Sequence, residues 1–111
     1  MTFDPGDVVY GADPFKGSDY ARPWLVISNA AHPFQGNQYI VLALTTRTWH
    51  EGLLSITDSQ WTDGGTPDPS RVVPWSVETL DESDIDHWQG TVTASLVDEA
   101  VDELETFVGS E

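Results

Sequence analysis

Short apolar runs separated by turn-forming residues dominate the chain from its start to about Pro74. The runs are rich in β-branched and aromatic side chains, which favour strands. We therefore predict strands at residues 6–11, 24–28, 38–46, 53–57 and 71–73. The third of these runs is apolar at nearly every position, which predicts that both of its faces are covered.

Proline and glycine indicate where the strands are interrupted. Residues 13–22 and 62–70 are predicted to be loops, because both combine Pro and Gly with polar side chains. Pro23 is expected to start the second strand, since proline cannot donate to a strand ladder. For the same reason Pro74 is expected to mark an edge or a bend.

The end of the chain has a different period. Val97, Val101, Leu104 and Val108 recur at helical spacing, and acidic residues occupy the opposite face. Ser95 and Asp98 have the spacing of a capping box, with Ser95 as the expected N-cap, and Gly109 suits a helix stop. Short strands plus one terminal helix predict a mainly β fold, a compact β-barrel closed by that helix. No repeat or linker is evident, so we expect one domain over residues 1–111.

Composition supports a folded chain despite its charge. The 111 residues include 19 acidic and 4 basic side chains, for a net charge of −15, but 39% are hydrophobic and 11% aromatic. That apolar supply is enough for a core, which argues against disorder. The absence of cysteine excludes disulfides and thiolate chemistry.

The acidic residues are unevenly distributed. Residues 1–77 carry all four cations and eight acids, whereas residues 78–111 carry eleven acids and no Lys or Arg. An acidic tail that recruits a basic partner is one explanation. Adaptation to concentrated salt is the other, because the Debye length falls to about 3 Å at 1 M salt. We favour salt adaptation, since the acids recur through strand-like and helix-like segments alike.

Several function classes find no support. His32, His50 and His87 are isolated, so each is interpreted as a surface or turn residue, and no metal-ligand, phosphate-loop or dinucleotide motif occurs. We therefore expect no metal and no cofactor. The longest apolar run, residues 40–44, is far too short for a membrane span, and the N-terminus lacks a secretory pattern. These features predict a cytoplasmic protein without a membrane partner.

The four cations are the most informative residues. Arg22 directly precedes Pro23, whose fixed backbone angle aims the guanidinium, and Arg22 suits a bidentate grip on phosphate or carboxylate. Thr45 and Thr46 precede Arg47 at the end of the third predicted strand. If the second and third strands are antiparallel neighbours, Arg22 and Thr45 share one rim of the barrel. Surface pairing with nearby carboxylates is the alternative explanation for Lys16, Arg47 and Arg71.

These residues and their order resemble the MazF/PemK toxins of type II toxin–antitoxin systems. Residues 13–19 followed by 22–29 are similar to the family hallmark Gly-Ser-Glu … Arg-Pro-x-x-Val-x-Ser. Residues 6–9 resemble the family's first strand, 44–46 the end of its third strand, and 89–109 its terminal helix with the lead-in. The resemblance covers nearly the whole chain, and the acidity suggests a haloarchaeal-like variant.

The resemblance implies an SH3-like barrel of the CcdB/PemK type, usually a homodimer, that cuts single-stranded RNA sequence-selectively. Cleavage in the family needs no metal, because the 2′-hydroxyl attacks the adjacent phosphate. Arg22 and Thr45 match the family's catalytic residues. Expected partners are RNA, a cognate antitoxin and, through the antitoxin, operator DNA. The candidate RNA-binding residues are Lys16, Ser18, Asp19, Tyr20, Thr46, Arg47, Trp49 and Arg71.

Two non-catalytic alternatives remain open at this point. The same architecture occurs in the CcdB gyrase poisons, so the chain is alternatively a module that binds a protein target. An inactive relative that binds only antitoxin or operator DNA is the other. Cleavage of single-stranded RNA in the presence of a chelator distinguishes the nuclease from both.

Overall fold

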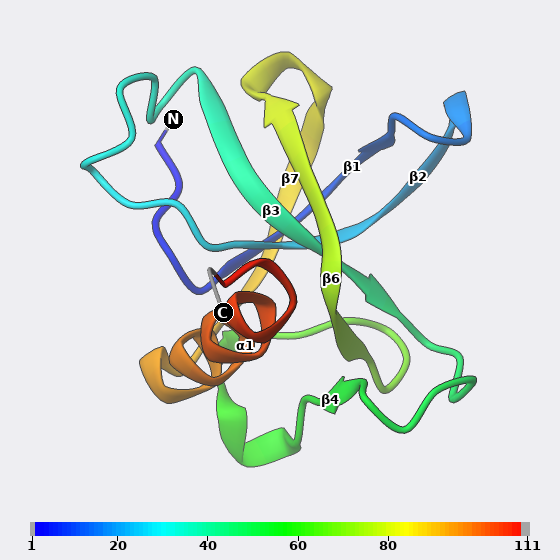
Figure 1. Ribbon diagram of the computed structural model, residues 1–111. Helices are drawn as coiled ribbons and strands as arrows, with labels where there is room; N and C mark the ends of the chain where they lie inside the picture. The colour runs from blue at the N-terminus through cyan, green and yellow to red at the C-terminus, as the bar shows by residue number, and fades with distance from the viewer. Residues whose placement is uncertain (1, 110–111) are drawn as a thin grey trace.

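The computed structural model describes residues 2–109, apart from the side chain of Ser18. Over that range the chain forms seven strands and one α-helix, with two short 3-10 turns (Figure 1). The elements are β1 (Asp7–Asp13), β2 (Gly17–Val26), β3 (Gln38–Thr45), β4 (Leu54–Ser55), β5 (Trp61–Gly64), β6 (Arg71–Asp81), β7 (Ile85–Val92) and α1 (Ala94–Val108).

The seven strands form one antiparallel sheet in the order β4-β6-β3-β2-β1-β7-β5. The sheet curls into a half-barrel, and α1 lies against it near β6 (Figure 1). A mainly β curled sheet with one C-terminal helix is the architecture that the sequence predicts.

Both faces of β3 are buried, as its apolar run predicts. Leu42 and Leu44 join the cluster under α1, where Leu96 packs. Val41 and Ala43 point the other way, into a second cluster. Successive side chains of a strand point to opposite faces, so this one strand fixes the sheet between two apolar layers.

The predicted loop at residues 13–22 is wrong over its second half. β2 begins at Gly17 and pairs with β1 through Arg22 and Pro23, so these residues extend a hairpin. The ladder between β2 and β3 begins at Trp24, one residue after Pro23. The missing N–H of proline therefore falls at the end of that ladder, where the strand tolerates it.

Three further boundaries also differ from the predictions. Residues 62–64 belong to β5 rather than to a loop, and β7 lies in a stretch where no strand is predicted. Most residues of both strands are exposed, so their sequences lack the alternation of apolar and polar residues that predicts a strand. β6 continues past Pro74, but its register against β3 shifts between the pairs Leu42↔Val77 and Leu44↔Val72. The expected bend at Pro74 is thus a bulge within a longer strand.

The helix starts earlier than the capping-box spacing predicts. Thr93, not Ser95, is the N-cap, and its side chain accepts a hydrogen bond from the Leu96 N–H. Gly109 is at the C-cap with a φ of −66°, so this glycine ends the helix without a left-handed conformation. No helix within residues 2–109 has the length and apolar content needed to traverse a bilayer.

Candidate functional site

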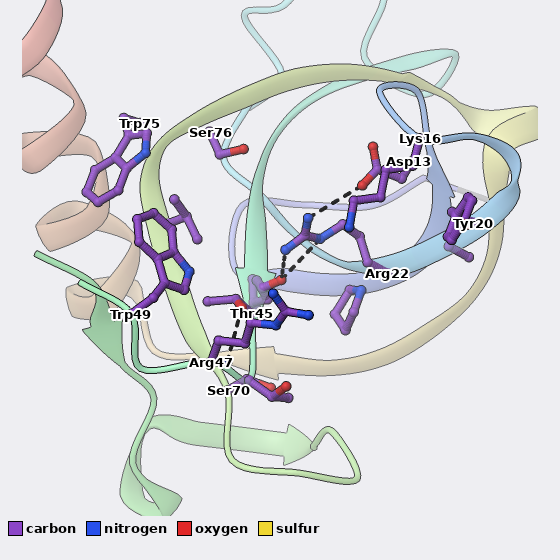
Figure 2. Close-up of a pocket in the computed structure, with 15 residues that line it drawn as sticks. Asp13, Lys16, Tyr20, Arg22, Thr45, Arg47, Trp49, Ser70, Trp75 and Ser76 are labelled. Atoms are coloured by element: carbon purple, nitrogen blue, oxygen red, sulfur yellow. Dashed lines mark hydrogen bonds and ion pairs between the residues drawn. The ribbon is translucent and has the colours of Figure 1, made fainter. Parts of the chain in front are cut away.

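Arg22 and Thr45 lie on one wall of a single cavity. The antiparallel register Trp24↔Ala43, continued by two residues, brings Arg22 opposite Thr45. This confirms the strand arrangement on which their predicted proximity depends. Both side chains line a cavity of about 440 Å³ between the β1–β2 hairpin and the ends of β3 and β6 (Figure 2).

The Arg22 guanidinium is held from three sides. Its Nε and Nη2 donate to the Leu44 carbonyl at 3.2 and 2.5 Å, and Nη1 donates to Asp13 Oδ2 at 3.4 Å (Figure 2). The Trp24 ring lies 5.7 Å from its central carbon. Because a guanidinium has five N–H groups, one hydrogen on each Nη is left to point at a ligand. The side chain is 27% exposed, so its charge is fixed in place while reaching the cavity.

Asp13 is the acid that orients this arginine, a site residue that the sequence does not predict. It ends β1, is 3% exposed, and its Oδ1 accepts the Phe15 N–H at 2.9 Å. Both carboxylate oxygens are therefore engaged. In the structure, burial alternates along the end of β1, so Asp13 points inward like Gly11, but the sequence itself shows no polar and apolar alternation that would predict this.

Thr45 lines the same cavity as the guanidinium and contributes a hydroxyl to it. Its Oγ1 accepts the Arg47 N–H at 3.1 Å, which fixes the oxygen at the end of β3. A hydroxyl that accepts one bond still has its own hydrogen to donate. Thr45 also pairs with Arg71 across the sheet, and Arg71 Nη1 donates to the Thr46 carbonyl at 3.4 Å.

The structure brings most of the predicted RNA-binding residues into this cavity, but not all of them. Those that line it are Lys16, Tyr20, Thr46, Arg47 and Trp49. Asp19 and Arg71 are not among the lining residues, although Arg71 touches the neighbouring backbone. Ser18 belongs to β2, and its side chain lies outside the described part of the structure.

Besides Asp13, the cavity wall contains three polar or aromatic residues that the sequence does not predict as site residues. Ser70 lies where β6 begins, and Trp75 and Ser76 lie in the β6 bulge. The bulge is what turns these side chains toward the cavity. A proline inside an apolar run is a signal for such an irregularity, but it does not say which side chains are re-aimed.

The cavity concentrates positive charge in an acidic protein. Three of the chain's four cations, Lys16, Arg22 and Arg47, line it, and the fourth, Arg71, is bonded to its rim. Among the side chains that the structure describes, Asp13 is the single carboxylate in the lining. The wall therefore carries a formal charge of +2 in a chain of net charge −15, an arrangement suited to an anion.

The histidines and carboxylates offer little alternative chemistry. Nδ1 of His32 accepts the Phe34 N–H and Nδ1 of His50 accepts the Gly52 N–H, both in turns, while His87 stacks on Tyr10. These contacts agree with the surface or turn interpretation. Within residues 2–109, no three His, Asp or Glu side chains gather closely enough to hold a metal ion.

Comparisons with known proteins agree with the fold. A family model described as "PemK-like, MazF-like toxin of type II toxin-antitoxin system" matches residues 4–108. No curated protein sequence gives a significant match.

Solved structures are similar over almost the full chain. An endoribonuclease from a mycobacterial species, solved with its cognate antitoxin, has 25% identity and a TM-score of 0.70, covering 97% of this chain and 94% of its own. A second mycobacterial endoribonuclease has 24% identity and a TM-score of 0.73, covering 98% of this chain and 93% of its own. A MazE–MazF structure from Deinococcus radiodurans has 18% identity and a TM-score of 0.73, covering 100% of this chain and 99% of its own.

Proposed function

We propose that this chain, which belongs to the PemK-like, MazF-like toxin family of type II toxin–antitoxin systems, is an endoribonuclease that cuts single-stranded RNA. Two structurally similar proteins are endoribonucleases. The scissile phosphate binds between Arg22 and Thr45, and cleavage is sequence-selective and needs no metal.

The observation that carries this proposal is the collection of every Lys and Arg around one cavity. Salt-screened surface pairs contribute little to stability, so scattered cations would be expected if they served only to pair with the 19 acids. Arginine fits the bidentate geometry of a phosphate better than lysine does, and Arg22 is the cation held most firmly.

The proposed reaction is the one that the family resemblance implies, and these side chains are suited to it. The 2′-hydroxyl oxygen forms a bond to phosphorus and loses its proton to water, while the bond from phosphorus to the 5′ oxygen breaks. The leaving oxygen takes a proton from water, giving a 2′,3′-cyclic phosphate and a free 5′-hydroxyl. Arg22 donates hydrogen bonds to the phosphate oxygens as negative charge develops. It acts through charge and hydrogen bonds, because arginine does not deprotonate in proteins.

Thr45 and the remaining cations position the substrate. The Thr45 hydroxyl orients the attacking 2′-hydroxyl beside the phosphate, and Lys16 and Arg47 hold neighbouring phosphates. Arg71 supports the Thr46 backbone and adds positive charge at the rim. Asp13 is a positioning residue rather than a base, since both of its oxygens already accept hydrogen bonds.

Acidity is an adaptation to concentrated salt in this proposal. Counterion release gives little affinity at molar salt, so binding depends on directed contacts such as those of Arg22. An acidic surface with one basic cavity fits that requirement.

The biological setting is proposed from the family. Two of the similar structures are toxin–antitoxin complexes, which supports a cognate antitoxin as partner here. We also propose a cytoplasmic homodimer that reaches operator DNA through the antitoxin. Light scattering of the purified protein tests the dimer.

The test of function is incubation of a long single-stranded RNA with the purified protein in 2 M KCl and EDTA. The expected products end in a 2′,3′-cyclic phosphate, and a duplex of the same sequence stays intact. RNA that is left uncut under these conditions supports the non-catalytic alternatives instead.

A further inference from the structure

Four aromatic side chains form a continuous group at one end of the cavity. The ring centroids of Trp49 and Trp75 are 5.8 Å apart with an interplanar angle of 79°, and His50 packs against both at 5.7 and 5.0 Å. Trp75 also meets Phe107 of α1 edge to face at 5.8 Å. Trp49 and Trp75 line the cavity opposite Arg22 and Lys16 (Figure 2). We call the pair Trp49 and Trp75 the aromatic wall.

Trp75 reaches the cavity because β6 is irregular at this point. Residues 73–76 lie between the partners of Leu42 and Leu44, so they bulge relative to β3. Pro74 lies inside this bulge, where its missing N–H interrupts no regular pair. The bulge thus serves to aim an indole at the site.

The aromatic wall is exposed in a way that a simple core cluster is not. Trp49 is 56% exposed, and Trp75 is only partly buried. Large aromatic surface left open next to a basic cavity is suited to stacking on a nucleobase, since every base has a π-face. The near-perpendicular indoles form a corner, a geometry that suits stacking on one ring and an edge contact with the other.

Phe107 supports this corner from the helix. Phe107 lies in the last turn of α1, and it holds the side of Trp75 with an edge-to-face contact. The loop at residue 52 also packs closely: a Cβ added to Gly52 would lie 3.0 Å from His50 Nδ1 and 3.3 Å from Trp75 Cζ3. Trp75 therefore contacts both α1 and the loop at residue 52.

We propose that Trp75, together with Trp49, binds one unpaired nucleobase next to the phosphate held at Arg22, and that Phe107 is the positioning residue for Trp75. This inference rests on the proposed nuclease function. It explains why the substrate is single-stranded, because a base inside a duplex cannot leave its stack to enter the corner without the cost of unpairing.

The test begins with mapping the cleavage sites in a long single-stranded RNA of known sequence. Nine-nucleotide substrates that span one mapped site are then made. Each lacks the base at one position, and every position is tested in turn except the nucleotide that supplies the 2′-hydroxyl. For the unaltered protein, one abasic position adjacent to the cut lowers kcat/KM by about 10- to 100-fold, the range expected for one lost stack. In Trp75→Leu, removal of the same base lowers kcat/KM less than about threefold, because the stacking partner in the protein is already gone.

The matched control is Trp88→Leu. Trp88 is also partly exposed, at 38%, but it lies on β7 and does not line the cavity. Its abasic profile should equal that of the unaltered protein. If Trp75→Leu keeps the full abasic penalty, the base-binding role is overturned while the nuclease stands. If no RNA is cut by the unaltered protein, the proposed function fails and the inference fails with it.

Phe107 is tested by the same substrates. Phe107→Ala raises KM about fivefold with kcat nearly unchanged, and Phe107→Tyr restores KM. The neighbouring change Val108→Ala, at a residue 69% exposed, has no effect. In the double variant with Trp75→Leu, the effect of Phe107→Ala disappears, because the two residues act as a unit. An additive loss, or a fall in kcat with unchanged KM, contradicts the positioning role.

Discussion

Arg22 Nη1 lies 3.4 Å from Asp13 Oδ2, and this contact joins two strands at the floor of the cavity. Asp13 is almost fully buried, whereas the guanidinium reaches solvent. The acid therefore determines the direction of the arginine without covering it. If the contact with this internal acid buried the Arg22 side chain, the guanidinium could not reach a phosphate and the nuclease proposal would fail. The Arg22 side chain is 27% exposed, so it remains accessible.

The substitution Asp13→Asn tests this orienting role. The introduced amide keeps an oxygen for the Phe15 N–H but loses the negative charge that faces Arg22. We expect kcat to fall about tenfold and the free energy of unfolding to fall by about 1–2 kcal/mol, because a buried partner of a charged group is lost. Denaturant unfolding and single-turnover cleavage measure the two effects. An unchanged kcat would show that Leu44 and Trp24 alone orient the arginine.

The Thr45 hydroxyl is tested by Thr45→Val, which keeps the shape of the side chain. We expect cleavage to fall at least about 30-fold, because the oxygen at the attacking centre is removed while the β3 backbone is retained. The control is Thr79→Val, at an exposed position of β6 that does not line the cavity. Equal losses in both variants would point to a general strand effect.

The start of α1 gives a stability prediction. Thr93→Ala should lower the free energy of unfolding by about 1 kcal/mol, because the Leu96 N–H loses its acceptor. Ser95→Ala should change it by less than about 0.5 kcal/mol, since position 95 lies inside the helix. Urea denaturation of both variants measures the difference. The reverse order would restore Ser95 as the cap.

Salt dependence tests the adaptation proposed for the acidic surface. The free energy of unfolding should rise between 0.1 and 2 M KCl, because screening weakens repulsion among the acids. The variant Asp98→Asn/Asp102→Asn carries two fewer charges on an exposed helix face, so its salt slope should be smaller. Equal slopes in both proteins would attribute the salt effect to something other than surface charge.

The sequence predicted the parts of the fold that rest on apolar period. The strand at residues 38–46 and the helix through Leu104 have one strong pattern each, and the structure contains both. β7 was not predicted because Asp86, His87 and Trp88 are exposed, so its apolar contacts come only from Ile85 and Val92 at its two ends.

Only the site residues that are cations or lie at predicted strand ends could be predicted from the sequence. Arg22 and Thr45 follow from antiparallel neighbours, a geometry that sequence order suggests. Trp75 depends on a register shift, and Asp13 on a burial that local sequence represents poorly. Such features arise from tertiary packing, so a single sequence contains little trace of them.

The most direct test of the account compares Arg22→Lys with the unaltered protein on single-stranded RNA in 2 M KCl and EDTA. Lysine keeps the positive charge but loses the planar fork that Leu44 and Asp13 hold in place. The account predicts that the rate falls at least about 100-fold, while circular dichroism and the melting temperature show a folded protein. Cleavage by the lysine variant at close to the unaltered rate would contradict the central role of the Arg22 guanidinium.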